Sequence, residues 1–162
     1  MFRKLHSQTL EIVHQDITPK YEKETKEMIQ NTVKVDLDEL KLCERKGKGV
    51  IKVVYQDCVD TAYELQKNGF NPLILNMGSS TIPGGKWSKG SPAQEESLFY
   101  RSNFFLGLKE ELYPIMNNEV IYTPNVYIKK YRYYFDNIVF SILDFNRSNN
   151  FEIFSKELNC LD

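Results

Sequence analysis

Two adjacent carboxylic acids, Glu95 and Glu96, lie near the end of a glycine- and proline-rich stretch, PGGKWSKGSPAQEESL, over residues 83–98. Gly84 and Gly85 tolerate positive φ angles and let backbone N–H groups approach an anion closely. Two acids beside an anion site indicate acid/base chemistry on a phosphate-bearing substrate. Adjacent helix positions point about 100° apart, so one acid can face the ligand while the other anchors the loop.

The element that must present these acids is a helix with a marked start. Ser91 suits the N-cap, Pro92 the first helical position and Gln94 the capping-box position. The helix N-terminus adds partial positive charge, which favours ionised acids in the first turn. We expect the helix to continue along an inner stripe of spaced residues: Leu98, Ser102, Phe105, Leu108 and Leu112.

Ahead of the loop, the sequence predicts a strand–helix–strand unit. Residues 49–56, GVIKVVYQ, are rich in β-branched residues and predict a strand. The next stretch, DCVDTAYELQKNG, predicts a helix that Asp57 caps and Gly69 ends. Residues 71–77, NPLILNM, predict an apolar strand of the kind found where both faces of a parallel sheet are covered. This βαβ unit leads directly into the glycine-rich loop.

The remaining segments complete an α/β fold with a mixed sheet and flanking helices. EVIYTPNVYIKK and DNIVFSILDF predict strands, whereas residues 3–15 and NNFEIFSKELNCL predict helices. Residues 20–31 are mostly charged and suit a solvated helix or an exposed connector. We expect one domain over residues 1–162, with an N-terminal helical or accessory segment (1–45) and a core (49–146) that carries the ligand loop (78–96).

Composition narrows the classes of function. A net charge of −1 argues against a general nucleic-acid binder, and no apolar run approaches the length that spans a bilayer. The N-terminus lacks the apolar core of a signal peptide. Three scattered cysteines (Cys43, Cys58 and Cys160) and two histidines offer no metal-ligand spacing. These features predict a cytoplasmic protein with reduced thiols, no membrane association, no metal and no cofactor.

The loop features also have structural explanations. The helix dipole alone favours acids in a first turn, and paired glycines are common in loops. The loop matches neither the Rossmann nor the P-loop spacing. Trp87 can serve as a packing anchor for the loop or as a stacking surface for adenine. The residues by themselves therefore predict an α/β domain with an anion or nucleotide site near 78–96.

A longer pattern in this region resembles a known family. LILNMGSSTIPGGKWSKGSPAQEESLFYRS is similar to the signature of the microbial-type poly(ADP-ribose) glycohydrolases of the macrodomain superfamily. The shared pattern is a strand ending in Asn, a step of small residues, Pro, a glycine run, a spacer and Gln-Glu-Glu. The spacer here is WSKGSPA, and the resemblance continues through SLFYRSNFF, LYP and IYTPNVYI.

The resemblance implies a macrodomain-like fold and a role for each matched residue. Glu96 is implied as the catalytic acid/base, which protonates the leaving ribose oxygen of an O-glycosidic bond and then activates water. Glu95 is implied to assist it by positioning the ribose and the loop. The ligand implied is ADP-ribose or an ADP-ribosylated protein, without a metal. The implied ligand-binding residues are Asn76, Ser79, Gly84, Gly85, Lys86 and Gln94.

Two departures from the family pattern leave alternatives open. Lys86 replaces the third loop glycine, where its side chain could crowd a diphosphate or form an ion pair with it. Nothing after Asn146 resembles the family's second ligand loop, so we expect a C-terminally truncated form. That form could be a minimal domain, a domain completed by a second copy or another chain, or a repurposed one. The alternative to a hydrolase is thus a non-catalytic relative that binds ADP-ribose-type nucleotides or acts as a protein-interaction module.

Overall fold

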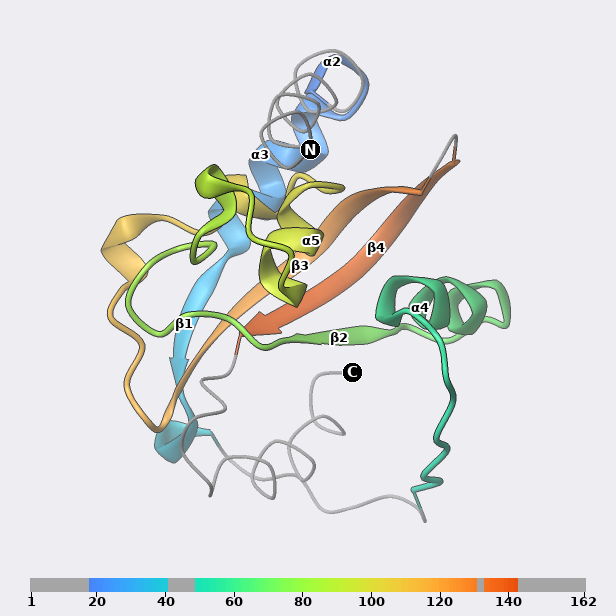
Figure 1. The fold of residues 1–162 in the computed structure, drawn as a ribbon, viewed down its shortest axis with the longest axis horizontal. Helices are drawn as coiled ribbons and strands as arrows, with labels where there is room; N and C mark the ends of the chain where they lie inside the picture. Colours follow the sequence, from blue (N-terminus) through green and yellow to red (C-terminus); the bar gives the residue numbers. More distant parts are fainter. Residues whose placement is uncertain (1–17, 41–48, 131–132, 143–162) are drawn as a thin grey trace.

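The computed structural model describes residues 18–40, 49–130 and 133–142, which build a four-stranded mixed sheet with helices around it (Figure 1). The strand order is β1-β3-β4-β2. β1 pairs antiparallel with β3, β3 pairs antiparallel with β4, and β2 runs parallel to β4. The strands are β1 (Val33–Asp36), β2 (Leu73–Asn76), β3 (Glu119–Lys130) and β4 (Tyr133–Ile142).

The helices are short and lie against particular strands. α3 contacts β3, α4 contacts β2, and α5 carries the two acids. Four 3-10 turns, η2 to η5, complete the described elements. The bounds are α2 (Thr18–Lys20), α3 (Glu22–Asn31), η2 (Leu37–Glu39), α4 (Cys58–Lys67), η3 (Trp87–Lys89), α5 (Gln94–Phe99), η4 (Phe104–Leu106) and η5 (Glu110–Leu112).

The main core joins α5 to the sheet. Leu98 and Phe99 of α5 pack in one buried cluster with residues from α3, α4, β2 and β3. Because burying one large apolar side chain contributes about 1.5–3 kcal/mol, this cluster fixes α5 firmly against the sheet. The cluster's other members are Met28, Val59, Ala62, Ile74, Phe104, Leu108, Ile115, Ile121, Val126 and Ile128.

Several predicted elements are confirmed. α4 begins after Asp57, whose Oδ1 accepts the Val59 N–H at 2.9 Å, and it ends just before Gly69, which has φ +83°. The predicted strands NPLILNM, EVIYTPNVYIKK and DNIVFSILDF correspond to β2, β3 and β4, and the charged segment 20–31 contains helix α3. The predicted helices at residues 3–15 and in NNFEIFSKELNCL lie outside the described residues.

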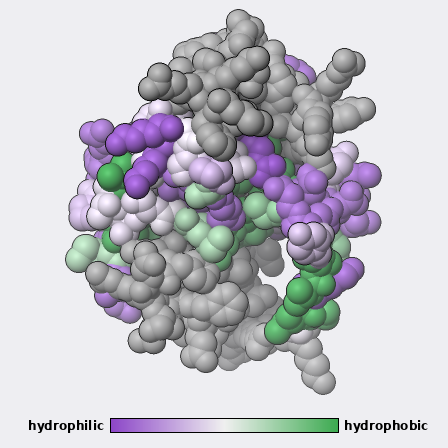
Figure 2. Space-filling view, viewed as in Figure 1, coloured by the Kyte–Doolittle hydropathy of each residue, from purple (hydrophilic) through white to green (hydrophobic). Residues whose placement is uncertain are grey.

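Residues 49–56 do not form the predicted strand. They are irregular and their apolar side chains are exposed, and a hydrophobic stretch is visible on the surface in Figure 2. β2 pairs with β4 instead. The predicted βαβ unit is therefore wrong among the described residues. β-propensity reflects packing against a neighbouring strand, and none of the described strands pairs with this segment. The sequence interpretation also missed β1, which lies inside the predicted N-terminal segment 1–45.

The predicted helix start and length at the acids are wrong as well. α5 begins at Gln94, and its N-cap is Ala93, which makes no side-chain cap. The helix ends at Phe99 rather than continuing to residue 112. The Ser102 hydroxyl donates to the Leu98 carbonyl at 2.7 Å and accepts the Phe104 N–H at 3.2 Å, so it competes with helical backbone bonding there.

Candidate active site

The Glu95 carboxylate lies buried at the carboxyl end of β2, where three N–H groups donate to it. The Ser79 N–H reaches Oε2 at 3.0 Å, and the Gly84 N–H reaches Oε1 at 3.2 Å. The side-chain amide of Asn76, the last residue of β2, donates to Oε1 at 3.4 Å. Only 4% of Glu95 is exposed. The loop after β2 thus folds around this acid.

Glu96 is held by the same loop from the next position. Its Oε1 accepts the Lys86 N–H at 3.0 Å, and the residue is 5% exposed. Gly85 lies between the two acids with φ +56°. A Cβ at this position would lie 3.0 Å from Glu96 Oε1 and 3.2 Å from Glu95 Oε2, so the close approach of the loop to both acids depends on glycine.

The glycine loop rests on aromatic side chains. A Cβ on Gly84 would come within 2.1 Å of the Phe99 ring, so the loop backbone packs directly on α5. The Trp87 ring stacks on Phe105 with centroids 5.4 Å apart and lies 5.8 Å from Phe99. The Tyr100 hydroxyl donates to the Trp87 carbonyl at 2.7 Å. In the described structure Trp87 therefore occupies the packing position that the sequence interpretation allowed.

Burial raises the pKa of Glu95 to about 7. The N–H groups of Ser79, Asn76 and Gly84 oppose this rise, because they stabilise the carboxylate, whereas the neighbouring Glu96 adds to it. A carboxyl group with a pKa near 7 carries a proton in about half of the molecules at neutral pH. Glu95 can therefore hold or release a proton under physiological conditions.

Two buried polar atoms beside Glu95 have no hydrogen-bond partner within the described part of the chain. They are Asn76 Oδ1 and the Tyr113 hydroxyl oxygen. Burial, followed by the charge of Glu95, raises the pKa of Tyr113, so its hydroxyl remains protonated at neutral pH. Unsatisfied buried groups are costly, and they concentrate where a water or ligand completes the structure.

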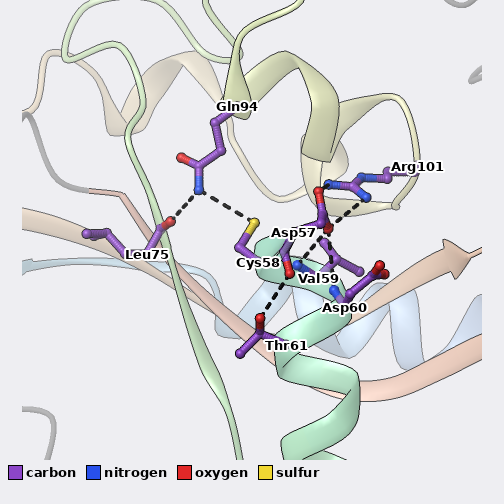
Figure 3. Close-up of polar contacts among 8 residues, drawn as sticks. All are labelled: Asp57, Cys58, Val59, Asp60, Thr61, Leu75, Gln94 and Arg101. Carbon is purple, nitrogen blue, oxygen red and sulfur yellow. Dashed lines mark hydrogen bonds and ion pairs between the residues drawn. The ribbon is translucent and has the colours of Figure 1, made fainter. Parts of the chain in front are cut away.

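Gln94 points to the edge of the sheet rather than to the loop (Figure 3). Its Nε2 donates to the Leu75 carbonyl at 2.9 Å, and its Oε1 accepts the Met77 N–H at 2.8 Å. Nε2 also lies 3.7 Å from the Cys58 sulfur. The side chain thus fastens the start of α5 to β2 and to the start of α4, and the two acids follow directly in the sequence.

Arg101 fastens the other end of α5. Its Nη1 and Nη2 donate to Oδ1 and Oδ2 of Asp57 at 3.1 and 3.0 Å (Figure 3). This bidentate pair links the residues just after α5 to the N-cap of α4. Sequence reasoning missed Arg101, because nothing in the local pattern identifies a partner so distant in the chain.

The structure brings most of the predicted site residues to one place. The side chain of Asn76, the backbone amides of Ser79, Gly84 and Lys86, and Gly85 surround Glu95 and Glu96. The Lys86 side chain is exposed, and Gln94 contacts the sheet edge. No group of His, Cys, Asp and Glu that could hold a metal ion lies within residues 18–40, 49–130 and 133–142. No helix in those ranges is long and apolar enough to cross a membrane.

The fold and site define a mixed-sheet α/β protein that buries paired carboxylates beneath a glycine loop. The model of the microbial-type PARG catalytic domain, where PARG denotes poly(ADP-ribose) glycohydrolase, matches residues 7–142. The chain therefore belongs to the microbial-type PARG catalytic-domain family.

Solved structures of PARG enzymes share this fold. The chain is similar to the Thermomonospora curvata enzyme, with 18% identity and a TM-score of 0.72, over 88% of this chain and 63% of that one. The same enzyme bound to the inhibitor ADP-HPD gives 18% identity and 0.67 over 94% and 68%. The Deinococcus radiodurans enzyme in complex with ADP-ribose gives 25% and 0.57 over 72% and 56%.

The chain thus spans 63% of the length of the T. curvata chain that it matches. A comparison with curated proteins found no match.

Proposed function

We propose that this protein hydrolyses O-glycosidic linkages of ADP-ribose, in the manner of a poly(ADP-ribose) glycohydrolase. The observation that carries the proposal is the pair of buried carboxylates under the glycine loop, with Gly85 packed against both. Glycosidases use two carboxyl groups whose environments set them to different tasks. Membership of the PARG family supports this chemistry over other uses of paired acids.

In this proposal the two acids have different roles. Glu96 is the acid/base that protonates the leaving ribose oxygen and then activates water, as the family resemblance implies. Glu95 is anchored by three N–H donors, so it fixes the loop and orients the ribose. The proton that Glu95 carries near neutral pH lowers the repulsion between the adjacent acids.

The ligand-binding residues of the proposal surround these acids. The unpartnered Oδ1 of Asn76 is suited to accept a hydrogen bond from a ribose hydroxyl. The exposed Lys86 side chain can reach a diphosphate without entering the space between the acids. Gln94 contributes by holding α5 on β2. The substrate is ADP-ribose attached to another unit or to a protein, and we place the reaction in the cytoplasm.

The test replaces Glu96 with Gln, which keeps the side-chain shape and removes the acid. We expect Glu96→Gln to abolish release of ADP-ribose from an ADP-ribosylated protein. A lost general acid/base costs about 10²–10⁴-fold in rate. The matched control is Glu64→Gln on the exposed side of α4, which should keep full activity. Unchanged turnover in Glu96→Gln, with a normal melting temperature, would contradict the proposal.

A second candidate is a non-catalytic ADP-ribose binder, and Lys86 at a family glycine position favours it. Calorimetric titration of ADP-ribose into the wild-type protein, combined with an assay of ADP-ribose release, separates the two candidates. Binding together with ADP-ribose release supports the hydrolase. Binding without release from either poly- or mono-ADP-ribosylated protein supports the binder. No heat at millimolar ligand would reject both candidates.

A further inference from the structure

β2 presents a free backbone edge. It stands at the end of the sheet order, so one side of it faces no strand within the described residues. The Leu75 carbonyl points to that side, because it accepts the Gln94 amide there. Backbone groups of alternate residues in a strand face the same edge, so Leu73 faces it as well. Gln94 also binds the Met77 N–H and therefore covers the end of this edge as a neighbouring peptide group would.

An apolar groove follows the free edge. It has a volume of about 500 Å³ and lies between β2, α4 and residues 52–56. Its walls are mainly aliphatic and include Val53, Val54, Ala62, Leu65, Leu73 and Leu75. A groove of this kind beside unpaired strand groups suits an extended peptide, because the backbone supplies hydrogen bonds and the groove receives apolar side chains.

The chain also holds a strand-like segment without a sheet. Residues 50–55, VIKVVY, make no backbone hydrogen bond to another described residue. Val50, Ile51 and Val53 are 90%, 95% and 92% exposed, and Tyr55 is fully exposed. The segment leads away from the start of α4 (Figure 1), and a hydrophobic stretch stands out on the space-filling surface (Figure 2). Contiguous exposed apolar residues of this type mark an interaction site.

We propose that residues 50–55 of one copy pair with the free edge of β2 in a second copy, and that the exchange is reciprocal. Among the described residues, each chain supplies one unpaired strand-like segment and one unpaired strand edge, so two copies satisfy both. The result is a closed twofold dimer in which the same surfaces meet twice. Pairing uses the backbone N–H and carbonyl of Leu73 and the N–H of Leu75. Gln94 keeps its hydrogen bonds to the Leu75 carbonyl and the Met77 N–H.

The anchoring of Asp57 favours a second copy over closure within one chain. Asp57 caps α4 through the Val59 N–H and is held bidentately by Arg101. These bonds fix the chain only two residues after the segment ends. They hold the segment as a wall of the groove, which Val53 and Val54 line together with Leu73 of its own β2, and the groove between them is open to a strand from a second copy.

Light scattering across a protein concentration series tests the proposal. We expect the wild-type chain to form a dimer. The double variant Ile51→Asp with Val53→Asp should weaken the dimer at least about tenfold, because strand pairing would bury two charges. Met116→Asp is the control, since it places one such charge on another exposed apolar residue, 56% accessible, and should leave the dimer unchanged.

A second variant tests the accepting edge. Leu73→Pro removes the edge N–H without adding charge, and we expect it to weaken the dimer as well. Hydrogen exchange should show protected amides over residues 50–55 in the dimer and rapid exchange in the double variant. A wild-type monomer at all concentrations, or a dimer that the double variant leaves intact, would overturn the proposal. Protection of 50–55 in a monomer would likewise overturn it in favour of closure within one chain. None of these measurements involves ADP-ribose, so they are independent of the proposed function.

Discussion

At the scale of single residues, Gly85 sets how closely the loop approaches the acids. Its Cα faces both carboxylates, and a side chain there would press on Oε1 of Glu96 and Oε2 of Glu95. The Lys86 and Gly84 amides on either side of it donate to those same carboxylates. A residue without a side chain therefore decides the geometry of the site.

Gly85→Ala should inactivate the protein and destabilise it. The positive φ alone costs a residue with a Cβ about 1–2 kcal/mol, and the contacts with the two carboxylates add to that. Gly69→Ala is the matched control, because Gly69 also has a positive φ but an added Cβ would meet nothing within 4 Å. Denaturant unfolding and ADP-ribose release measure the two effects. Equal losses in both variants would show that crowding at the acids is unimportant.

At the scale of elements, α5 is clamped at both ends. Gln94 fastens its first residue to β2, and Arg101 fastens the residues after it to the N-cap of α4. β2 and α4, which both precede α5 in the sequence, thereby hold this six-residue helix (Gln94–Phe99) in place. A helix this short has little stability of its own, so its position depends on those clamps and on its buried face.

Substitutions at Asp57 separate its two functions. Asp57→Asn keeps a good N-cap but loses the charge that pairs with Arg101, so we expect a loss of about 0.2–1 kcal/mol in unfolding free energy. Asp57→Ala loses the cap as well and should cost about 1 kcal/mol more. Denaturant melts of both variants, with and without high salt, measure the difference. Equal stability of the two variants would mean that the cap contributes nothing.

The same elements show which structural features the sequence could predict. α4 was predictable because its signals are local: Asp57 caps it and Gly69 ends it. Residues 49–56 carry strand propensity, but a strand needs a partner that no local pattern supplies. α5 ends before Ser102, whose hydroxyl donates to the Leu98 carbonyl, and the spaced stripe of residues did not reveal this bond.

The candidate site also combines features that the sequence could predict with features that it could not. The positions of Glu95 and Glu96 after the glycine loop were predictable, because that spacing is contained in one continuous stretch. The partners of Gln94 were not, because its side-chain amide binds a strand edge seventeen or more residues earlier in the chain. Which N–H group meets which acid also depends on the folded path of the loop.

At the scale of the whole molecule, the buried acid links stability to pH. The pKa of Glu95 rises from its ordinary value of 4.5 to about 7 on folding, mainly because of burial. The folded state therefore binds a proton that the unfolded state releases between these two values. Its contribution to stability is complete below pH 4.5 and is lost as the pH rises towards 7.

We expect the unfolding free energy to fall by about 3 kcal/mol between pH 4.5 and 7.5 because of this group. Glu95→Gln, which cannot titrate, should remove that part of the slope while other groups keep theirs. Chemical denaturation at half-unit pH steps measures both profiles. Identical slopes in the wild type and the variant would show that Glu95 has the same pKa in the folded and unfolded states and would contradict the raised pKa.

Trp87 provides the molecule with an intrinsic fluorescence probe. It is the one tryptophan in the chain, and it packs on Phe105 in the loop that covers the acids. Its fluorescence therefore reports on that loop alone, whereas the emission of the ten tyrosines is spread over the chain. Exciting the indole selectively therefore follows the packing of this loop against Phe99 and Phe105 without any label.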